Sequence, residues 1–373
     1  MMRGACKMIA LLGAMTMTSP AAAQSSDLYK GIKVTGMLTF QHILTDNRDL
    51  DLNDMNTGQS YSVQPRVRVD VPLGEHTNIH SDVRALIIDS ENGVGAEDET
   101  GITSNAGEGF VELRELWVKQ DRLFGHIPLD LQAGRQRIRE PRALWWTRHL
   151  DAVRLNYDST LFKGFAGIGQ NLAAYRTNES DFGEDQEDRF RAFAEGSWQY
   201  TKDHYIEARV LYENDYSGIE NVGTFVPAND IDEEDFNLTW FGGRLKGKTE
   251  FENSTFAFLD YRLDLMGVIG EEDVLTTGFA AGNSRPVIQS RSRDVFGYGI
   301  DAGVNLRFAG QHAPQLTLNY AFGSGDENPS DGRNEGFRQT GLHGNSSRAG
   351  LSSSGVRNYG EVLRPELSNL HVL

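Results

Sequence analysis

Basic side chains recur at alternate positions of segments whose other positions are apolar. Between residues 60 and 71, Arg66 and Arg68 share one face, and valines occupy positions on the other. In a strand, this alternation turns one face to water and the other to apolar surroundings. A guanidinium is planar, permanently charged and matched to carboxylates. The basic residues at water-facing positions of the predicted strands are Lys33, Arg66, Arg68, Arg84, Arg114, Arg135, Arg154, Arg244, Arg262 and Arg364.

Two roles are open to these cations. Along a water-filled passage they would attract carboxylates and let them pass, provided that each contact is weak and repeated. Alternatively, they pair with acidic residues on the same faces and brace the wall. The acidic residues that could do so are Asp70, Asp82, Glu112, Glu115, Asp151, Asp260 and Asp264.

Catalytic patterns are missing from the sequence. The nine histidines are scattered, and we find no zinc-ligand spacing, nucleophile elbow or phosphate-binding glycine loop. A hydrolase or lyase needs a nucleophile with a base, or a pair of acids in a cleft. We therefore predict neither an enzyme nor a cofactor.

Acidic residues gather in four segments, 97–99, 184–188, 230–235 and 271–273. They could bind divalent cations beside lipopolysaccharide, but no spacing matches a calcium loop with its fixed glycine. The sequence predicts a solvated acidic surface and no metal ligand.

The N-terminus has the three-part pattern of a secretory signal peptide. Arg3 and Lys7 precede the apolar stretch 8–17, and three alanines end at Ala23. The apolar stretch is well short of the ~20 residues of a spanning helix. We expect a signal peptide over residues 1–23 and the barrel over residues 24–373. Cleavage would remove Cys6, the single cysteine, and with it any disulfide or thiol chemistry.

The chain is strongly acidic, with 36 Lys and Arg against 53 Asp and Glu and a formal net charge of −17. Loss of Arg3 and Lys7 with the signal would leave 34 basic residues and a net charge of −19. This balance argues against nucleic acid as a partner. It does not separate a membrane barrel from a soluble acidic protein.

The elements that would carry the basic residues are β-strands. A period of two recurs in segments 60–71, 190–200, 257–265 and 298–308, and helical periodicity is missing almost everywhere. An antiparallel all-β architecture follows. A soluble sandwich would also alternate, so periodicity alone does not decide between the two.

Junction lengths favour a membrane barrel, which has long loops at one end and short turns at the other. We expect about fourteen strands, each near the ~9–11 residues that cross the hydrocarbon. Tight turns are expected at 72–77, 158–159, 202–203, 247–253 and 310–314. Long connections are expected at 41–59, 89–109, 172–188, 214–236, 267–292 and 323–359, with a middling one at 140–150.

A barrel in lipid must close its last strand on its first. Residues 367–373 read as a strand that is just beginning, without a terminal aromatic. Either a small barrel closes here or the sequence lacks C-terminal strands, and we expect the second.

Several stretches resemble the alginate-export outer-membrane protein family. The resembling stretches are 113–117, 134–140, 144–146, 151–155, 337–342 and 360–370. The resemblance implies an eighteen-stranded antiparallel transmembrane β-barrel with an electropositive constriction that passes alginate, gated by an extracellular loop and a periplasmic turn. On this likeness Arg114, Arg135, Arg154, Arg338 and Arg364 become the preferred conducting residues, and Glu115 and Asp151 become acidic spacers. Lys33, Arg66, Arg68 and Arg262 complete the predicted conducting lumen.

Alternation between Glu112 and Gln120 is imperfect, because Leu113 and Leu116 do not share a face. A β-bulge there would re-aim Arg114 and Glu115.

The expected function is that of a passive outer-membrane channel that secretes an anionic exopolysaccharide, alginate. The alternative is an anion-selective porin for small organic acids or other anionic sugars. The expected partners are the polysaccharide, outer-membrane lipid and lipopolysaccharide, and periplasmic export or scaffold proteins.

Overall fold

The alternating segments of the sequence form long strands. The computed structural model describes residues 17–19, 31–46, 57–91, 96–97, 103–104, 109–178, 188–227, 234–252, 255–279, 284–328, 331–342 and 371–372. Thirteen described strands have nine residues or more. They are β2 (Lys33–Asp46), β3 (Thr57–Pro72), β4 (Thr77–Glu91), β7 (Gly109–Gln120), β8 (Leu129–Arg139), β9 (Thr147–Asp158), β10 (Phe162–Gln170), β11 (Arg189–Thr201), β12 (His204–Asp215), β14 (Glu234–Glu250), β15 (Phe256–Thr277), β16 (Ser284–Phe308) and β17 (Gln315–Gly323). The shorter elements are β1 (Met17–Ser19), β5 (Ala96–Glu97), β6 (Thr103–Ser104), η1 (Leu123–Gly125), β13 (Phe225–Pro227), β18 (Arg333–Asn334) and β19 (His371–Val372).

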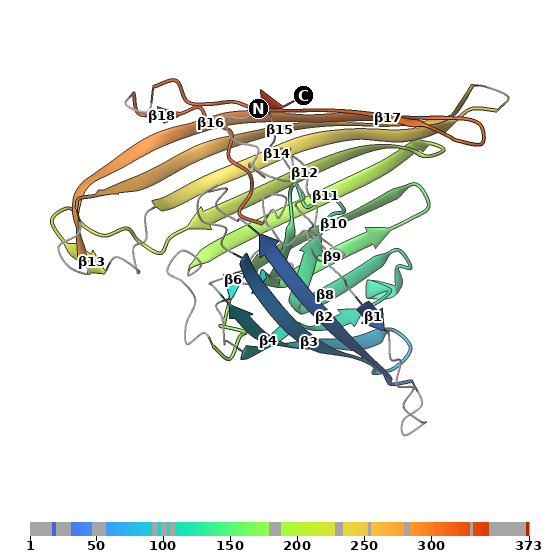
Figure 1. Ribbon diagram of the computed structural model, residues 1–373, viewed down its shortest axis with the longest axis horizontal. Coiled ribbons are helices and arrows are strands. Elements are labelled where there is room, and N and C mark those ends of the chain that lie inside the picture. The colour runs from blue at the N-terminus through green and yellow to red at the C-terminus, as the bar shows by residue number, and fades with distance from the viewer. Residues whose placement is uncertain are drawn as a thin grey trace, which may run out of the picture.

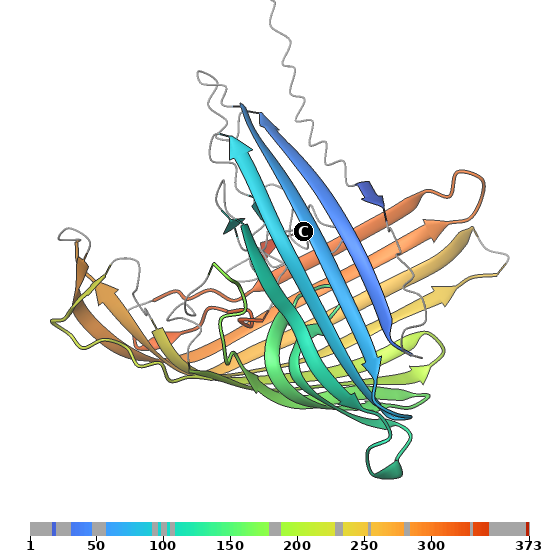
Figure 2. The same ribbon diagram turned by 90° about the horizontal axis from the view of Figure 1, so that it is seen from below.

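Each long strand pairs antiparallel with the next long strand along the chain, from β2–β3 through β16–β17. The result is one strongly curved sheet that bends around a central space, which we call the hollow (Figures 1 and 2). Among the described residues its end strands, β2 and β17, do not pair with each other. The predicted antiparallel β-barrel fold of about fourteen strands is confirmed. The part of the chain that the structure describes has no helix long and apolar enough to cross a membrane.

Connections differ at the two ends of the sheet. At one end they are short, with two residues between β11 and β12 and six between β16 and β17. At the other end β12 and β14 are eighteen residues apart, with β13 between them. The expected long connection at 267–292 is wrong, because β15 runs to Thr277 and β16 begins at Ser284. In these extensions Leu275 of β15 and Val287 of β16 pack with Val226 in a buried apolar cluster, a contact between distant segments that the local sequence pattern does not show.

The two faces of the sheet differ in chemistry. Large apolar side chains such as Val67, Val118 and Leu265 are exposed on the outer face. Their neighbours along the strands, such as Arg66 and Asp264, are buried on the inner face. An apolar outer band around a polar interior is the pattern of a transmembrane barrel.

A bulge on β7 resolves the imperfect alternation near Arg114. The β4–β7 register shifts between Asp82 and Val83, where Asp82 pairs with Glu115 and Val83 with Leu113. The extra residue is Arg114, which is 2% exposed. The bulge lies where the alternation breaks, and it lets adjacent charged residues face inward while Leu113 and Leu116 both face outward.

The middle of β8 and β9 leaves the wall. β7 pairs with β8 only over residues 116–120, and its preceding residues bond instead to the segment after β10, through Leu113 N to Tyr175 O at 2.9 Å. We call residues 171–177 the bridging segment. The part of β8 and β9 that it displaces, residues 135–151, forms a hairpin inside the hollow, which we call the inner hairpin.

Gly134 marks the point where the inner hairpin departs. Its φ is +120°, and a Cβ built there would lie 2.3 Å from Leu116 O. Both facts require glycine, because that backbone conformation and that close approach exclude a side chain.

The main apolar cluster lies inside the hollow. The tip of the inner hairpin contributes Leu144, Trp145 and Trp146, which pack with Trp240 of β14 and Phe337 of a returning C-terminal segment. The core of this protein therefore fills part of the barrel interior.

Replacing Gly134 with Val should destabilise the fold by about 1–3 kcal/mol, because a strained conformation is combined with a backbone clash. Thermal loss of heat-modifiable gel migration measures the change. Gly36→Ala on β2 is the control, since a Cβ at Gly36 meets nothing within 4 Å. Equal melting of Gly134→Val and the parent would contradict the proposed turning point.

Candidate functional site

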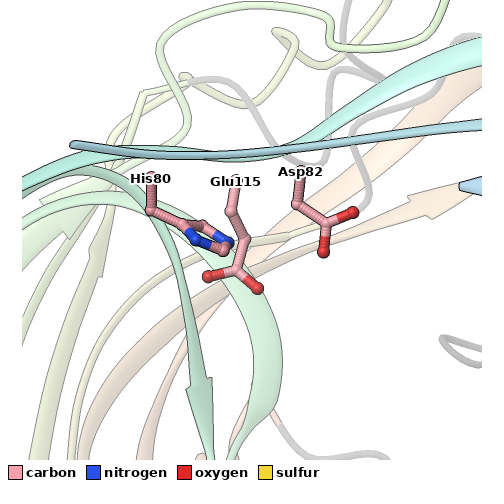
Figure 3. Close-up of side chains that lie close together, drawn as sticks. All are labelled: His80, Asp82 and Glu115. Carbon is pink, nitrogen blue, oxygen red and sulfur yellow. The ribbon is translucent and has the colours of Figure 1, made fainter. Parts of the chain in front are cut away.

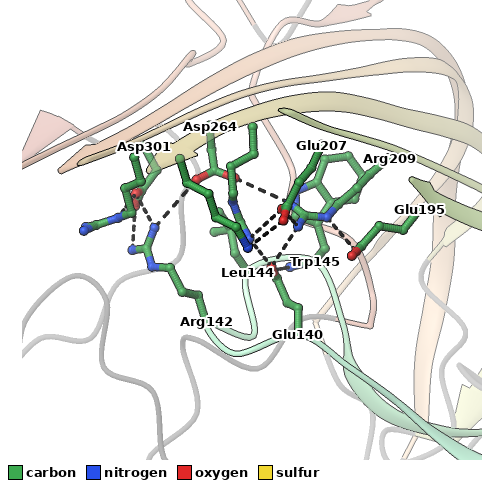
Figure 4. A network of polar contacts seen from close by, with 12 residues as sticks. Glu140, Arg142, Leu144, Trp145, Glu195, Glu207, Arg209, Asp264 and Asp301 are labelled. Atoms are coloured by element: carbon green, nitrogen blue, oxygen red, sulfur yellow. Dashed lines mark hydrogen bonds and ion pairs between the residues drawn. The ribbon is translucent and has the colours of Figure 1, made fainter. Parts of the chain in front are cut away.

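The loop of the inner hairpin is held by Glu140, which is 3% exposed. One carboxylate oxygen accepts a hydrogen bond from Trp145 N at 2.7 Å and fixes the loop itself. The other lies 2.9 Å from Arg244 Nη1 and 3.6 Å from Arg209 Nη2. The loop is thereby tied to β12 and β14, as Figure 4 shows.

Arg142 reaches further across the hollow. It forms a two-pronged ion pair with Asp301 on β16, with Nη2 to Oδ2 at 3.0 Å, and lies 3.9 Å from Asp264 on β15. Asp301 also pairs with Arg262 at 3.3 Å. One loop therefore contacts strands far from its own (Figure 4).

A C-terminal segment, residues 337–342, packs on the same loop. Thr147 N donates to Leu342 O at 2.7 Å, and Gln339 Nε2 donates to Leu144 O at 3.1 Å. Trp240 Nε1 donates to Arg338 O at 2.7 Å. The inner hairpin is thus clamped between the wall and this segment.

Most predicted conducting arginines take part in ion pairs with the wall. Arg66 and Arg68 both bind Asp82, which is fully buried. Arg262 binds Asp301 and donates to Asn319 at 2.5 Å. These residues have the bracing geometry that the sequence left open.

Arg338 and Arg114 show two further environments. Arg338 pairs with Glu234, and lies 3.3 Å from Glu272. Arg114 lies 4.0 Å from Glu112, and Arg84, Arg66 and Arg137 act on it electrostatically. Four strands, β3, β4, β7 and β8, thus bring several cations together around the bulge.

Arg135 and Arg154 lie on paired strands at the root of the inner hairpin. Arg135 is stacked 3.5 Å from the centre of the Tyr175 ring, and its nearest described carboxylate is Asp151 at 3.8 Å. Arg154 Nη2 donates a hydrogen bond to Gln132 Oε1 at 3.0 Å, and no carboxylate of a described residue lies within 4 Å of Arg154. These two predicted residues carry weakly neutralised charge.

The bridging segment positions Asp151 and Arg135. Tyr175 donates its hydroxyl proton to Asp151 at 2.5 Å, and Leu172 N donates to the other oxygen at 2.9 Å. Asp151 is therefore occupied by these two donors and does not form a short ion pair with Arg135.

The remaining predicted residues lie apart from this arrangement. Lys33 is exposed at the start of β2, opposite Asp70 in the register. Glu115 accepts a hydrogen bond from Trp117 Nε1 at 3.0 Å. Arg364 lies outside the described residues.

His80, Asp82 and Glu115 come close enough to suggest a metal site, with one ligand atom from each within 4.8 Å of the others (Figure 3). Their existing partners argue against it. Both oxygens of Asp82 accept bonds from Arg66, and His80 Nδ1 lies 2.7 Å from Asp70. A cation here would have to displace guanidinium groups, so the cluster is better explained as part of the wall.

Sequence reasoning missed the residues that hold the inner hairpin. Glu140 and Arg142 fall in a segment that we interpreted as a simple connection. The available signal was the Trp145-Trp146 pair, since two adjacent tryptophans in a loop between charged residues need burial. Other interior charges that we did not select are Arg176, Arg189, Arg191, Glu207, Arg209, Glu213 and Asp301.

A family model described as alginate export matches residues 61–373. This chain belongs to the alginate export family. Relatives include the alginate production protein AlgE of Pseudomonas aeruginosa, 30% identical over 70% of this chain and 52% of that protein. The AlgE protein of Pseudomonas syringae pv. tomato is 26% identical over 75% of this chain and 55% of its own length. This family member thus spans about half the length of the curated relatives it matches.

Two solved structures of OprB from Pseudomonas putida also match, at low and high pH, with TM-scores of 0.32 and 0.34 and 11% and 10% identity. Each match covers 78% of this chain, and 88% and 89% of the OprB chains.

Family membership, the antiparallel sheet and its apolar outer face make this alginate export family member an outer-membrane β-barrel. The resemblance found in the sequence is confirmed.

Replacing Glu140 with Ala should free the inner hairpin. The change leaves Arg244 and Arg209 without one of their buried partners, which costs about 3–5 kcal/mol. We expect a lower melting temperature of the folded barrel and a larger single-channel conductance. Asp158→Ala removes an exposed pair with Lys163 and is the control, since such pairs contribute about 0–1 kcal/mol. An unchanged conductance with a folded barrel would mean that the hairpin does not narrow the path.

Proposed function

We propose that the complete protein is a passive outer-membrane channel through which an anionic polysaccharide, alginate, leaves the cell. The curated relatives carry alginate production in their names, and the family model describes alginate export. In this proposal the inner hairpin narrows the passage, and the chain binds no cofactor and catalyses no reaction.

The weak neutralisation of Arg135 and Arg154 carries the proposal. The short ion pairs of Arg66 and Arg262 leave little free charge for a passing ligand, because a guanidinium bound to a carboxylate at close range is already satisfied. Arg135 has its nearest described carboxylate at 3.8 Å, and the side-chain partner of Arg154 is a neutral amide. Both can exchange these contacts for those of a passing carboxylate.

The surroundings of the two arginines suit passage better than tight binding. Arg135 lies over the Tyr175 ring and Arg154 lies 5.5 Å from the Phe165 ring centre, so aromatic surfaces flank both charges. Successive carboxylates of the polymer move from one cation to the next. Conduction requires contacts that are weak and repeated. A strong binding site would retain the polymer instead.

The other cations proposed for the lumen act at a distance. Arg114, Arg338 and Lys33 add positive potential around the passage, and Asp151 and Glu115 separate the charges. Arg66, Arg68 and Arg262 brace the wall and shape the route. Arg364 remains a proposed member. Outer-membrane lipid, lipopolysaccharide and periplasmic export proteins are the proposed partners.

Charge reversal at Arg135 or Arg154 tests the proposal. In planar bilayers, Arg135→Glu and Arg154→Glu should lower the anion-to-cation permeability ratio by about twofold to fivefold, which corresponds to roughly 0.5–1 kcal/mol per contact. Block by oligomannuronate should weaken in parallel. Truncation to Ala should do less, because it removes attraction without adding repulsion.

Arg307→Glu, at the exposed end of β16, is the matched control and should change both quantities less. Arg191→Ala provides a contrast, because Arg191 is 1% exposed and bound to Glu213 at 2.9 Å. It should lower stability and leave selectivity near that of the parent. Selectivity without uronate block would indicate a small-anion porin. Unchanged selectivity in both reversals would overturn the proposal.

A further inference from the structure

A second lumenal feature lies away from the inner hairpin, at the end of the barrel with the short turns. It is a cavity of about 390 Å³ between β12, β14, β15 and β16. Asp203 of the turn between β11 and β12 forms part of its rim. Short turns face the periplasm in outer-membrane barrels, so the cavity opens on the periplasmic side.

The cavity faces the interior of the barrel. Lys246 and Lys248 alternate along β14 with the same phase as Arg244 and Trp240, which point inward. Tyr205 has the phase of Arg209 on β12. A molecule in the cavity would therefore lie in the lumen, before the inner hairpin on the outward route.

The floor of the cavity is flat and cationic. A Cβ at Gly303 would lie 2.2 Å from Nη1 of Arg262, so the guanidinium rests directly on the backbone of β16. Arg262 is fixed there by Asp301 and by the bond to Asn319. Glycine at 303 thus makes room for a planar group that a ligand can contact from the open side.

The walls combine an aromatic ring, two flexible cations and polar side chains. Lys246 Nζ lies 5.4 Å from the Tyr205 ring centre, and the side chains of Lys246 and Lys248 are 40% and 41% exposed. Asp260 and Asn305 supply an acceptor and an amide. Hydroxyl groups of a sugar donate to carboxylates and amides and accept from ammonium groups, while its carboxylate pairs with the cations.

We propose that this cavity is a periplasmic loading site that binds one or two uronate residues of the polysaccharide chain before it reaches Arg135 and Arg154. The inference rests on the proposed function, which supplies the uronate. Tyr205 packs against a sugar ring, Lys248 binds its carboxylate, and Asp260 with Asn305 orients its hydroxyls. The planar guanidinium of Arg262, held by Asp301, forms the floor on which the sugar lies. The site aligns the chain and raises its local concentration at the mouth.

The test uses the full protein in planar bilayers with a known orientation, and tetramannuronate added to one side at a time. In the double variant Tyr205→Leu, Lys248→Gln, the half-blocking concentration from the periplasmic side should rise about fivefold, as expected for loss of an exposed charge contact. Block from the extracellular side should stay at the parent value. Gly303→Ala, which displaces the Arg262 guanidinium, should reproduce the effect without touching Tyr205 or Lys248.

Lys163→Gln is the matched control. Lys163 is an exposed lysine of β10 that pairs with a nearby exposed acid, Asp158 at 3.1 Å, as Lys248 pairs with Glu250 at 2.7 Å, but it does not line the cavity. The half-blocking concentration of tetramannuronate for Lys163→Gln should equal that of the parent from both sides. Neutral glucose tetramers should block weakly and equally in all variants.

Three outcomes are distinguishable. In the first, tetramannuronate blocks the parent from both sides, and Gly303→Ala and the folded double variant have the same periplasmic half-blocking concentration as the parent. That result would overturn the loading site and leave the channel function intact. In the second, Lys163→Gln loses as much periplasmic block as the cavity variants do. That result would also overturn the loading site, because any exposed positive charge at the mouth of the barrel would then have the same effect. Absence of tetramannuronate block in the parent would overturn the proposed function itself.

Discussion

Burial of charge inside the barrel is the constraint on which the rest of the structure depends. Glu140, Arg209, Arg244 and Asp264 are all nearly inaccessible to solvent. An isolated ion in such a place is costly, so each must find a partner of opposite sign. The inner hairpin supplies Glu140 and the wall supplies the arginines, which means that neither is stable in this form without the other. The tryptophans of the hairpin then fill the space beside the ion pairs.

This constraint divides the lumen into layers. Nearest the long loops lies the apolar cluster of Trp146, Trp240 and Phe337. Below it come the ion pairs between the hairpin and β12–β16, and nearest the short turns lies the cavity lined by Lys248 and Tyr205. Charges that brace the wall are paired at close range. Charges at the root of the hairpin are paired loosely, because the bridging segment occupies Asp151 with Tyr175 and Leu172. An arginine in this lumen thus either braces the wall or remains able to contact a ligand. The distance to its nearest carboxylate decides between the two roles.

The sequence was informative wherever chemistry is local. Alternation predicted the strands and the inward side of Arg66, Arg154 and Arg262, and the break in alternation marked the position of the bulge at Arg114. Contacts between distant segments could not be predicted, because nothing at Arg142 specifies Asp301, which lies 159 positions later. The departure of the inner hairpin at Gly134 has only a glycine as its local mark. Arg66 pairs with Asp82, and not with a ligand, because of the register between β3 and β4. Turn lengths and side-chain alternation fix that register only in the assembled sheet.

The central claim is that a uronate chain contacts Arg135 and Arg154 as it passes the inner hairpin. Cys6 is the only cysteine of the chain, so Arg135→Cys and Arg154→Cys each place one thiol in the mature protein once the expected signal peptide is removed. The rate of modification by a small thiosulfonate reagent, with and without oligomannuronate, measures this contact directly. We expect saturating oligomannuronate to slow modification at both positions, whereas an uncharged glucose oligomer of the same length should not. Equal modification rates with and without oligomannuronate, in a channel that still folds, would contradict it.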